Sequence, residues 1–87
     1  MATTQEIREI VLKYVKEEYV EDEDQVVDFS TPLISGGIVD SFSMVSLKRF
    51  LENKYKIRIP DHKATPEAFD SVDKITRLVE SFAGVKN

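Results

Sequence analysis

Apolar and polar positions alternate at helical spacing in the first twenty residues. Thr3 and Glu6 stand three residues apart, the spacing of a capping box at a helix start. The apolar side chains that follow recur every three or four residues, which places them on one face of a helix. They are Ile7, Ile10, Val11, Tyr14 and Val15. The pattern predicts a first helix over residues 4–19.

Residues 20–40 show no sustained periodicity, and we expect a long loop there. The acidic run 21–24 ends the first helix, because acids at a helix C-terminus oppose its dipole. Several apolar side chains are available to hold the loop on the core: Val26, Val27, Phe29, Leu33 and Ile34. Loops of this length in a small domain are uncommon and often functional.

A second helix is predicted over residues 41–55, with Asp40 as its N-cap. At about 100° per residue, one stripe of this helix is apolar and is expected to face the core. The stripe contains Met44, Leu47, Leu51 and Tyr55. Phe42 and Val45 fall on the far side, near Arg49, so we expect two apolar side chains to be exposed there. The alternative is a different helical phase that buries both.

The remaining segments complete an all-helical pattern. Residues 56–60 alternate and stop at a proline, which indicates an extended connector. Thr65, Pro66 and Glu67 supply a cap, a helix-starting proline and a first-turn acid, so a short helix is expected at 66–70.

A last long helix is expected to begin at Asp70 or Ser71, and Gly84 stands where a C-terminal cap belongs. Its apolar residues are Val72, Ile75, Leu78, Val79 and Phe82. The predicted fold is therefore an all-α, small four-helix bundle of three long helices and one short helix. It forms a single domain over residues 1–87, with a long loop between the first two helices.

Composition excludes several classes of protein. Apolar residues make up 41% of the chain, and no apolar run approaches the roughly 20 residues that a membrane span requires. The first six residues lack the basic and apolar regions of a signal peptide. The absence of cysteine excludes a disulfide framework, a thiolate nucleophile and a Cys-based metal site. We expect a soluble, cytoplasmic monomer.

Charge is distributed unevenly along the chain. Residues 1–40 carry three Lys/Arg against ten acids, a net of −7, whereas residues 41–87 carry nine against six, a net of +3. The acidic half argues against nucleic acid as the main partner. No metal site is expected, because His62 is the only histidine and the acidic run 21–24 lacks the spacing of an EF-hand loop.

One serine stands at a position suited to carry a group. The run Gly36-Gly37-Ile38-Val39-Asp40-Ser41-Phe42 leads from the loop directly into the second helix. A helix start offers unpaired N–H groups and a partial positive charge, so a phosphate attached there is held at little cost. Asp40-Ser41 in isolation is most often only a cap. No paired acid and base, and no activated nucleophile, points to an enzyme.

The pattern resembles the acyl carrier protein family and the related aminoacyl and peptidyl carrier domains. The likeness runs from about Leu33 to Phe82 and rests on three segments: Asp40-Ser41-Phe42, Ile59-Pro60-Asp61 and Phe69-x-Ser71-Val72. It implies that Ser41 bears a 4'-phosphopantetheine arm, taken from coenzyme A, whose thiol carries an acyl group as a thioester. It also implies that Asp40 helps the modifying enzyme to position the serine.

The resemblance further implies the partners: a phosphopantetheinyl transferase, and the acyl- or aminoacyl-loading and acyl-transferring enzymes of fatty-acid, lipid or specialised-metabolite synthesis. The chain would be a substrate of these enzymes and not an enzyme itself. Its Gly-x-Val-Asp-Ser-Phe sequence also looks like D-alanyl and aminoacyl carriers, so an aminoacyl cargo stays open.

The chain departs from the commonest pattern of this family in its second helix. Fatty-acid carriers usually have a strongly acidic second helix, whereas here Lys48, Arg49 and Lys54 face a single acid, Glu52. Phe42 also replaces the usual leucine. We expect a partner-binding face made of Phe42, Val45, Lys48 and Arg49, suited to dedicated enzymes. An unmodified helical adaptor that binds through the same face is the alternative from a different class.

Overall fold

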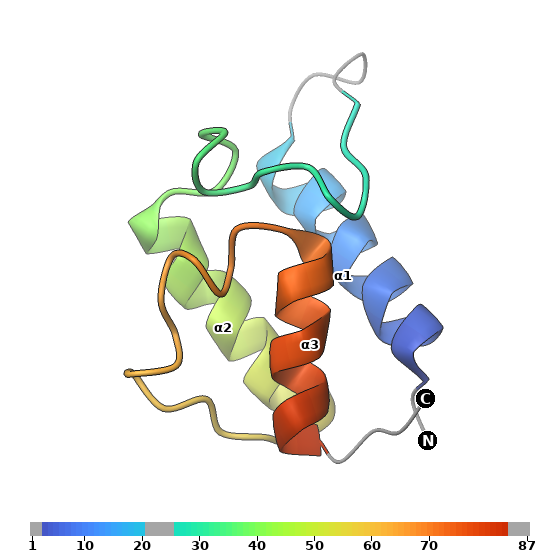
Figure 1. The fold of residues 1–87 in the computed structure, drawn as a ribbon, viewed down its shortest axis with the longest axis vertical. Coiled ribbons are helices and arrows are strands. Elements are labelled where there is room, and N and C mark those ends of the chain that lie inside the picture. Colours follow the sequence, from blue (N-terminus) through green and yellow to red (C-terminus); the bar gives the residue numbers. More distant parts are fainter. Residues whose placement is uncertain (1–2, 21–25, 84–87) are drawn as a thin grey trace.

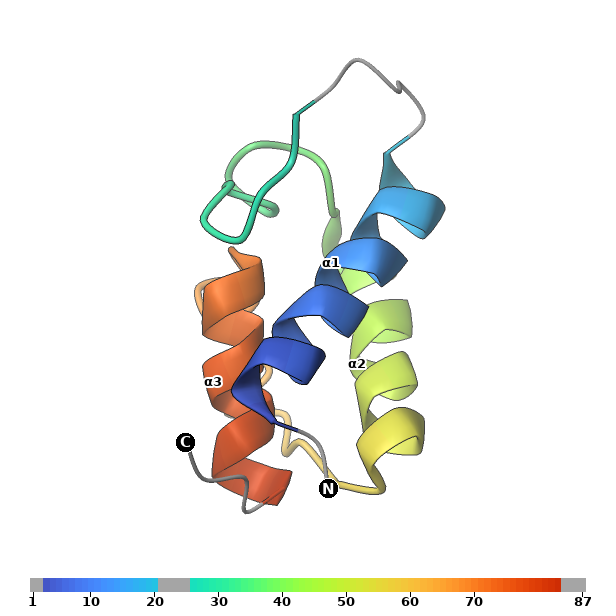
Figure 2. The ribbon, with the colours of Figure 1, turned by 90° about the vertical axis from the view of Figure 1, so that its right-hand side faces the viewer.

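A computed structural model describes residues 3–20 and 26–83, and these form three helices around one core (Figure 1). The helices are α1 (Thr4–Tyr19), α2 (Ser41–Tyr55) and α3 (Val72–Ala83). The predicted all-α class and the three long helices are therefore confirmed. Two views at right angles show the three helices packed side by side, with the loop 26–40 crossing the end where α2 and α3 begin (Figures 1 and 2).

Each helix begins at a polar side chain that caps it. Thr3 accepts the N–H of Glu6 at 3.2 Å, and Asp40 accepts the N–H of Ser43 at 2.8 Å, as the sequence predicts. The hydroxyl of Ser71 accepts a backbone N–H at the start of α3 at 3.1 Å. These bonds satisfy N–H groups that have no partner inside their own helix.

The core consists of the apolar faces of the helices and of side chains from the loops. Its thirteen buried members are Ile7, Val11, Val15, Val27, Leu33, Val39, Leu47, Leu51, Ile59, Phe69, Val72, Ile75 and Val79. Tyr14, Met44, Tyr55 and Leu78 are partly buried against this cluster. Val26, which was expected to help hold the loop on the core, is instead 83% exposed.

The short helix predicted at 66–70 is not formed. The N–H groups of Ala68, Phe69 and Asp70 donate to carbonyls three residues earlier, at 3.1, 3.2 and 3.4 Å, so the segment is a series of three overlapping turns. Five residues give too few bonds to offset the cost of starting a helix, and the buried side chain of Phe69 fixes the segment instead. The bundle therefore has three helices in its described residues. Gly84, the predicted cap, lies outside them.

The connector after α2 reverses the chain through Lys56, whose φ of 54° is left-handed. The N–H groups of Lys56 and Ile57 both donate to the carbonyl of Glu52, which closes the helix. The Glu52 side chain then accepts the N–H of Ile59 at 2.8 Å. With Ile59 buried, the extended connector is held beside the end of α2. No helix in the described residues is long and apolar enough to cross a membrane.

Burial predicts a large loss of stability for one substitution in α2 and almost none for another two residues away. Leu47→Ala removes a side chain with no exposed surface and should lower the free energy of unfolding by about 2–5 kcal/mol. Val45→Ala removes a half-exposed side chain and should change it by less than about 0.5 kcal/mol. Urea unfolding followed by circular dichroism measures both. Equal losses would show that the assigned face of α2 is wrong.

Candidate functional site

Ser41 is the first residue of α2 and is exposed at the end of the loop 26–40. The helix N-terminus lies directly behind it, and Asp40 caps that terminus. The backbone N–H of Met44 donates to the Asp40 carbonyl at 2.8 Å, which starts the helical bonding, while the Asp40 side chain accepts from Ser43. The predicted capping role of Asp40 is thus confirmed, and Ser41 stands on a regular first helical turn.

The Asp40 carboxylate is hydrogen-bonded to the first turn of α2. Its bond from the backbone N–H of Ser43 is the largest influence that lowers the pKa of Asp40. The group is therefore ionised at neutral pH and accepts hydrogen bonds from the first turn. Its position stabilises the helix on which Ser41 stands.

Tyr19, the last residue of α1, supports the first turn of α2 from the other side. Its hydroxyl donates to the carbonyl of Ser43 at 3.1 Å. Burial is the main cause that raises the pKa of Tyr19, so the hydroxyl keeps its proton at neutral pH. Tyr14 meets Tyr19 edge to face at 5.8 Å and stacks on Phe50 of α2 at 3.9 Å. These aromatic contacts join α1 to α2 below Ser41.

The loop before Ser41 is held by one carboxylate, that of Asp70. Its Oδ1 accepts the backbone N–H groups of Ile34 and Ser35, both at 2.8 Å, and Oδ2 accepts the Ser35 hydroxyl at 2.9 Å. The carbonyl of Asp70 also accepts the N–H of Leu33 at 2.7 Å. We call this group of bonds the Asp70 clamp. The bond from the Ser35 backbone N–H is the largest cause that lowers the pKa of Asp70.

A tight turn follows the Asp70 clamp. The carbonyl of Leu33 accepts the N–H groups of Ile38 and Val39, both at 2.9 Å, so the loop closes on itself two residues before Ser41. Gly37 has a left-handed φ of 79°, and a Cβ at Gly36 would lie 2.3 Å from the carbonyl oxygen of Pro32. Both glycines of the sequence motif are therefore required by the backbone.

Arg8 holds the loop at a second point. Its guanidinium lies 3.9 Å above the centre of the Phe29 ring and pairs with the Asp73 carboxylate at 3.0 Å. The N–H of Asp73 in turn donates to the carbonyl of Phe29 at 3.0 Å. One side chain of α1 thus fixes the loop against the start of α3. The sequence offered no signal for this contact or for the Asp70 clamp, because their partners are far apart along the chain.

The structure exposes three of the four residues of the predicted partner-binding face. Phe42 is 85% exposed and Val45 is 51% exposed, and Arg49 is exposed as well. The alternative in which both apolar side chains are buried is therefore wrong. Lys48 differs, because its side chain is only 22% exposed and its ammonium pairs with Asp61 at 3.3 Å. Lys48 holds the 61–63 turn against α2.

Other candidate residues gain no chemistry from the structure. His62 is exposed in the turn 61–63. No three His, Asp or Glu side chains within residues 3–20 and 26–83 are grouped so that they could hold a metal ion. The acidic run 21–24 lies outside the described residues.

The Asp70 clamp should make stability depend on acid pH. The pKa of Asp70 is lowered in the fold, so its contribution is complete above the unfolded value near 4 and is lost as pH falls through the folded value. In urea unfolding between about pH 2 and pH 7, Asp70→Asn should flatten part of the acid loss. Asp70→Ala should also lower stability at pH 7. A pH profile unchanged by Asp70→Asn would contradict the clamp.

Comparison with known proteins adds a fold relationship. No family model and no curated protein matches the chain, whereas seven chains of solved structures do. One belongs to a structure described as "Crystal structure of FAD-dependent dehydrogenase", with a TM-score of 0.70 and 32% identity. The match covers 79% of this chain and 97% of that chain, which is therefore about 70 residues long. This chain belongs to the same family of small helical domains as that matched chain.

Proposed function

We propose that this chain is a carrier protein that bears 4'-phosphopantetheine on Ser41 and presents an acyl or aminoacyl group to partner enzymes. The observation that carries the proposal is the placement of Ser41. It is an exposed hydroxyl at the first position of a capped helix, at the end of a loop fixed by the Asp70 clamp. The resemblance of the surrounding sequence to carrier proteins supports the same conclusion.

The residues present fit the proposed group. An exposed hydroxyl can form a phosphodiester without unfolding the helix, and the helix N-terminus stabilises the negative charge by about 0.3–1 kcal/mol. A Cβ built on Gly37 meets no other atom within 4 Å, so the turn leaves open space. When bound, the arm supplies a thiol that holds the cargo as a thioester. The chain itself supplies attachment, position and recognition.

Attachment of the arm needs no catalytic group from this chain. The Ser41 oxygen forms a bond to the phosphorus that joins the pantetheine half of coenzyme A, the bond to the nucleotide half breaks, and the serine proton is released. The transferase supplies the catalysis. The fixed first turn, held by Asp40 and Tyr19, presents the serine in one geometry. Tethering then raises the local concentration of the cargo at each enzyme.

The charge of α2 bears on the class of cargo. The exposed Arg49 on α2 fits enzymes other than those that select an acidic helix, which favours a specialised acyl or aminoacyl cargo. The solved structure named for a FAD-dependent dehydrogenase adds such an enzyme as a candidate partner. Such an enzyme would take two electrons and two protons from the tethered acyl or aminoacyl group, which gains a double bond as FAD becomes FADH2. Flavin reduction on mixing with the loaded carrier, and not with the unloaded one, would support that partner. An unchanged flavin spectrum with either cargo class would exclude it.

An unmodified adaptor is the second candidate, and the exposure of Phe42 and Val45 favours it equally. Such a protein would bind its partner through α2 and would not need a hydroxyl at position 41. The two functions therefore separate on Ser41→Ala, which abolishes the carrier and leaves the adaptor intact.

The proposed function predicts a single modification in vitro. Incubation with coenzyme A and a broad-specificity phosphopantetheinyl transferase should add one phosphopantetheine to the wild type, measured by intact mass. Ser41→Ala should gain nothing. Ser43→Ala is the matched control and should still be modified, because Ser43 contributes its backbone N–H to the cap. No gain on a wild type shown to be folded would contradict the carrier function.

A further inference from the structure

We infer that α2 and the connector after it form a docking surface for an enzyme whose binding site is an apolar pocket rimmed by carboxylates. The docking surface consists of Phe42, Val45, Arg49 and Arg58. The inference rests on the proposed function and names the chemical class of the partner surface. It differs from the face expected from sequence, because Arg58 joins it and Lys48 leaves it.

The apolar centre of the docking surface is exposed to solvent. Phe42 is 85% exposed, and Val45 is 51% exposed one turn later. These two and Arg49 are spaced by three and four residues, so they share one face of α2. Exposed aromatic anchors surrounded by polar residues are typical of protein interfaces. Phe42 also follows Ser41 directly, so its docking would bring the attachment site to the edge of the partner.

The docking surface is positively charged, because its arginines are unpaired within the part of the chain that the structure describes while the nearby acids have other partners. Lys48, Arg49 and Arg58 line one groove together with Glu52 and Asp61. Both acids have other partners, since Glu52 accepts the N–H of Ile59 and Asp61 pairs with Lys48. Among the described residues no ion pair involves Arg49 or Arg58, and both are exposed. Two guanidinium groups therefore face solvent with no carboxylate of residues 3–20 and 26–83 bound to them.

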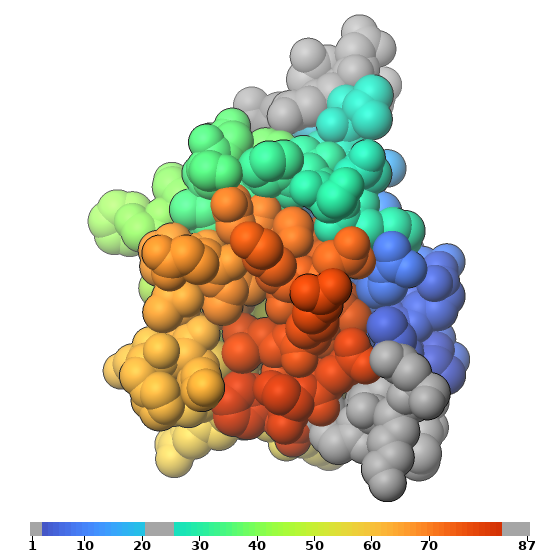
Figure 3. All heavy atoms as spheres, in the orientation of Figure 1, coloured from blue at the N-terminus to red at the C-terminus, as the bar shows by residue number. Residues whose placement is uncertain are grey.

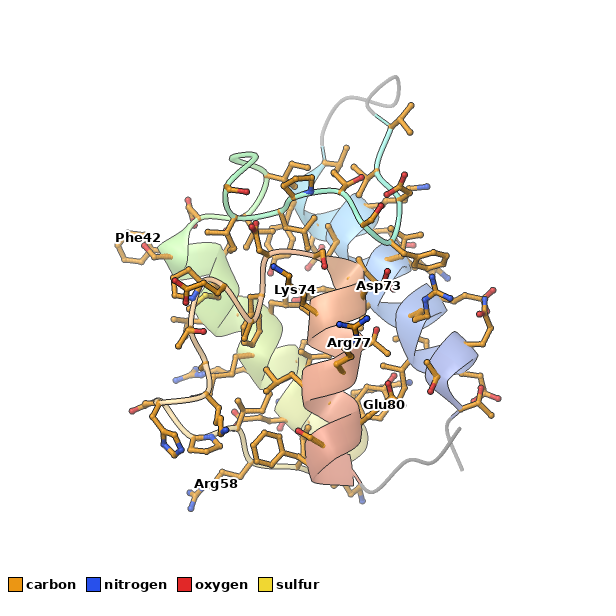
Figure 4. All side chains as sticks on the ribbon, in the orientation of Figure 1. Phe42, Arg58, Asp73, Lys74, Arg77 and Glu80 are labelled. Carbon is orange, nitrogen blue, oxygen red and sulfur yellow. The ribbon has the colours of Figure 1, made fainter. Side chains whose placement is uncertain are left out.

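The chain reversal at Lys56 brings Arg58 to this side of the molecule. Figure 4 shows Phe42 projecting to the left at the start of α2 and Arg58 at the lower left, on the connector that follows α2. In the space-filling view the start of α2 protrudes from that side (Figure 3). The docking surface thus runs from Phe42, beside the attachment site, to the groove that Arg49 and Arg58 line.

The other charged groove fits a docking site less well. It lies between α1 and α3, where Arg8 and Arg77 stand with Asp73 and Glu80. Two cations and two acids balance there, and Arg8 is bound to Asp73. The α2 groove has three cations against two acids, so it carries the excess positive charge. Charge complementarity therefore selects an acidic partner for α2, with an effect mainly on the association rate.

The test uses two versions of one phosphopantetheinyl transferase, with carboxylates or with lysines around its carrier-binding pocket. The initial rate of arm attachment to Ser41 should be about tenfold higher with the acidic version, and this advantage should shrink as salt rises. Arg49→Glu with Arg58→Glu should reverse the preference. Lys54→Glu is the matched control on the other side of α2 and should preserve it. Phe42→Ala should slow both versions.

The outcomes separate the two proposals. Equal rates with both versions, or a preference that survives the Arg49→Glu and Arg58→Glu changes, would overturn the docking surface and leave the carrier function standing. Faster attachment with the basic version would overturn the charge assignment. Failure of both versions to modify Ser41 on a folded chain would overturn the carrier function, and the docking surface with it. Circular dichroism of each variant confirms folding.

Discussion

The carboxylate of Asp70 fixes the part of the chain on which the site depends. Fifteen described loop residues, 26–40, lead into α2, and their backbone N–H groups need acceptors outside a helix of their own. Asp70 accepts two of these N–H groups with one oxygen and a hydroxyl with the other. A charged acceptor makes such bonds stronger than neutral ones. The path of the loop, and the entry of the chain into α2, follow from this clamp.

Three further contacts hold the loop and the first turn of α2, on which Ser41 lies. Arg8 holds the loop against α3 through Phe29 and Asp73, the glycine turn closes on the Leu33 carbonyl, and Tyr19 holds the first turn of α2. The glycine turn ends two residues before Ser41, and Tyr19 bonds to Ser43 two residues after it. The scaffold thus supplies position and exposure rather than reactive groups, which is the division of labour that a carrier requires.

Local features of this fold could be predicted from the sequence. The bounds of α1 and α2, the caps at Thr3 and Asp40, and the exposure of Phe42 follow from spacing and side-chain chemistry within a few residues. Contacts between distant residues could not be predicted in this way. The Asp70 clamp spans 35 and 36 residues along the chain, and the contact between Arg8 and Asp73 spans 65.

The errors have the same origin. At 66–70 the local signals favour a helix, but the burial of Phe69 and the bonds of Asp70 to the loop favour turns. Lys48 was expected on the partner-binding face, yet the reversal at Lys56 brings Asp61 within 3.3 Å of it. These contacts depend on which distant segments the fold brings together, and the periodicity of a single segment does not contain that information.

The most direct test of the account is the mass of the protein isolated from cells that make it, followed by fragmentation of the peptide that contains Ser41. The account predicts a covalent phosphopantetheine on the Ser41 oxygen, with or without a thioester-bound cargo. A protein that is wholly unmodified, in cells shown to contain an active transferase, would contradict it. So would a phosphopantetheine located on any other residue.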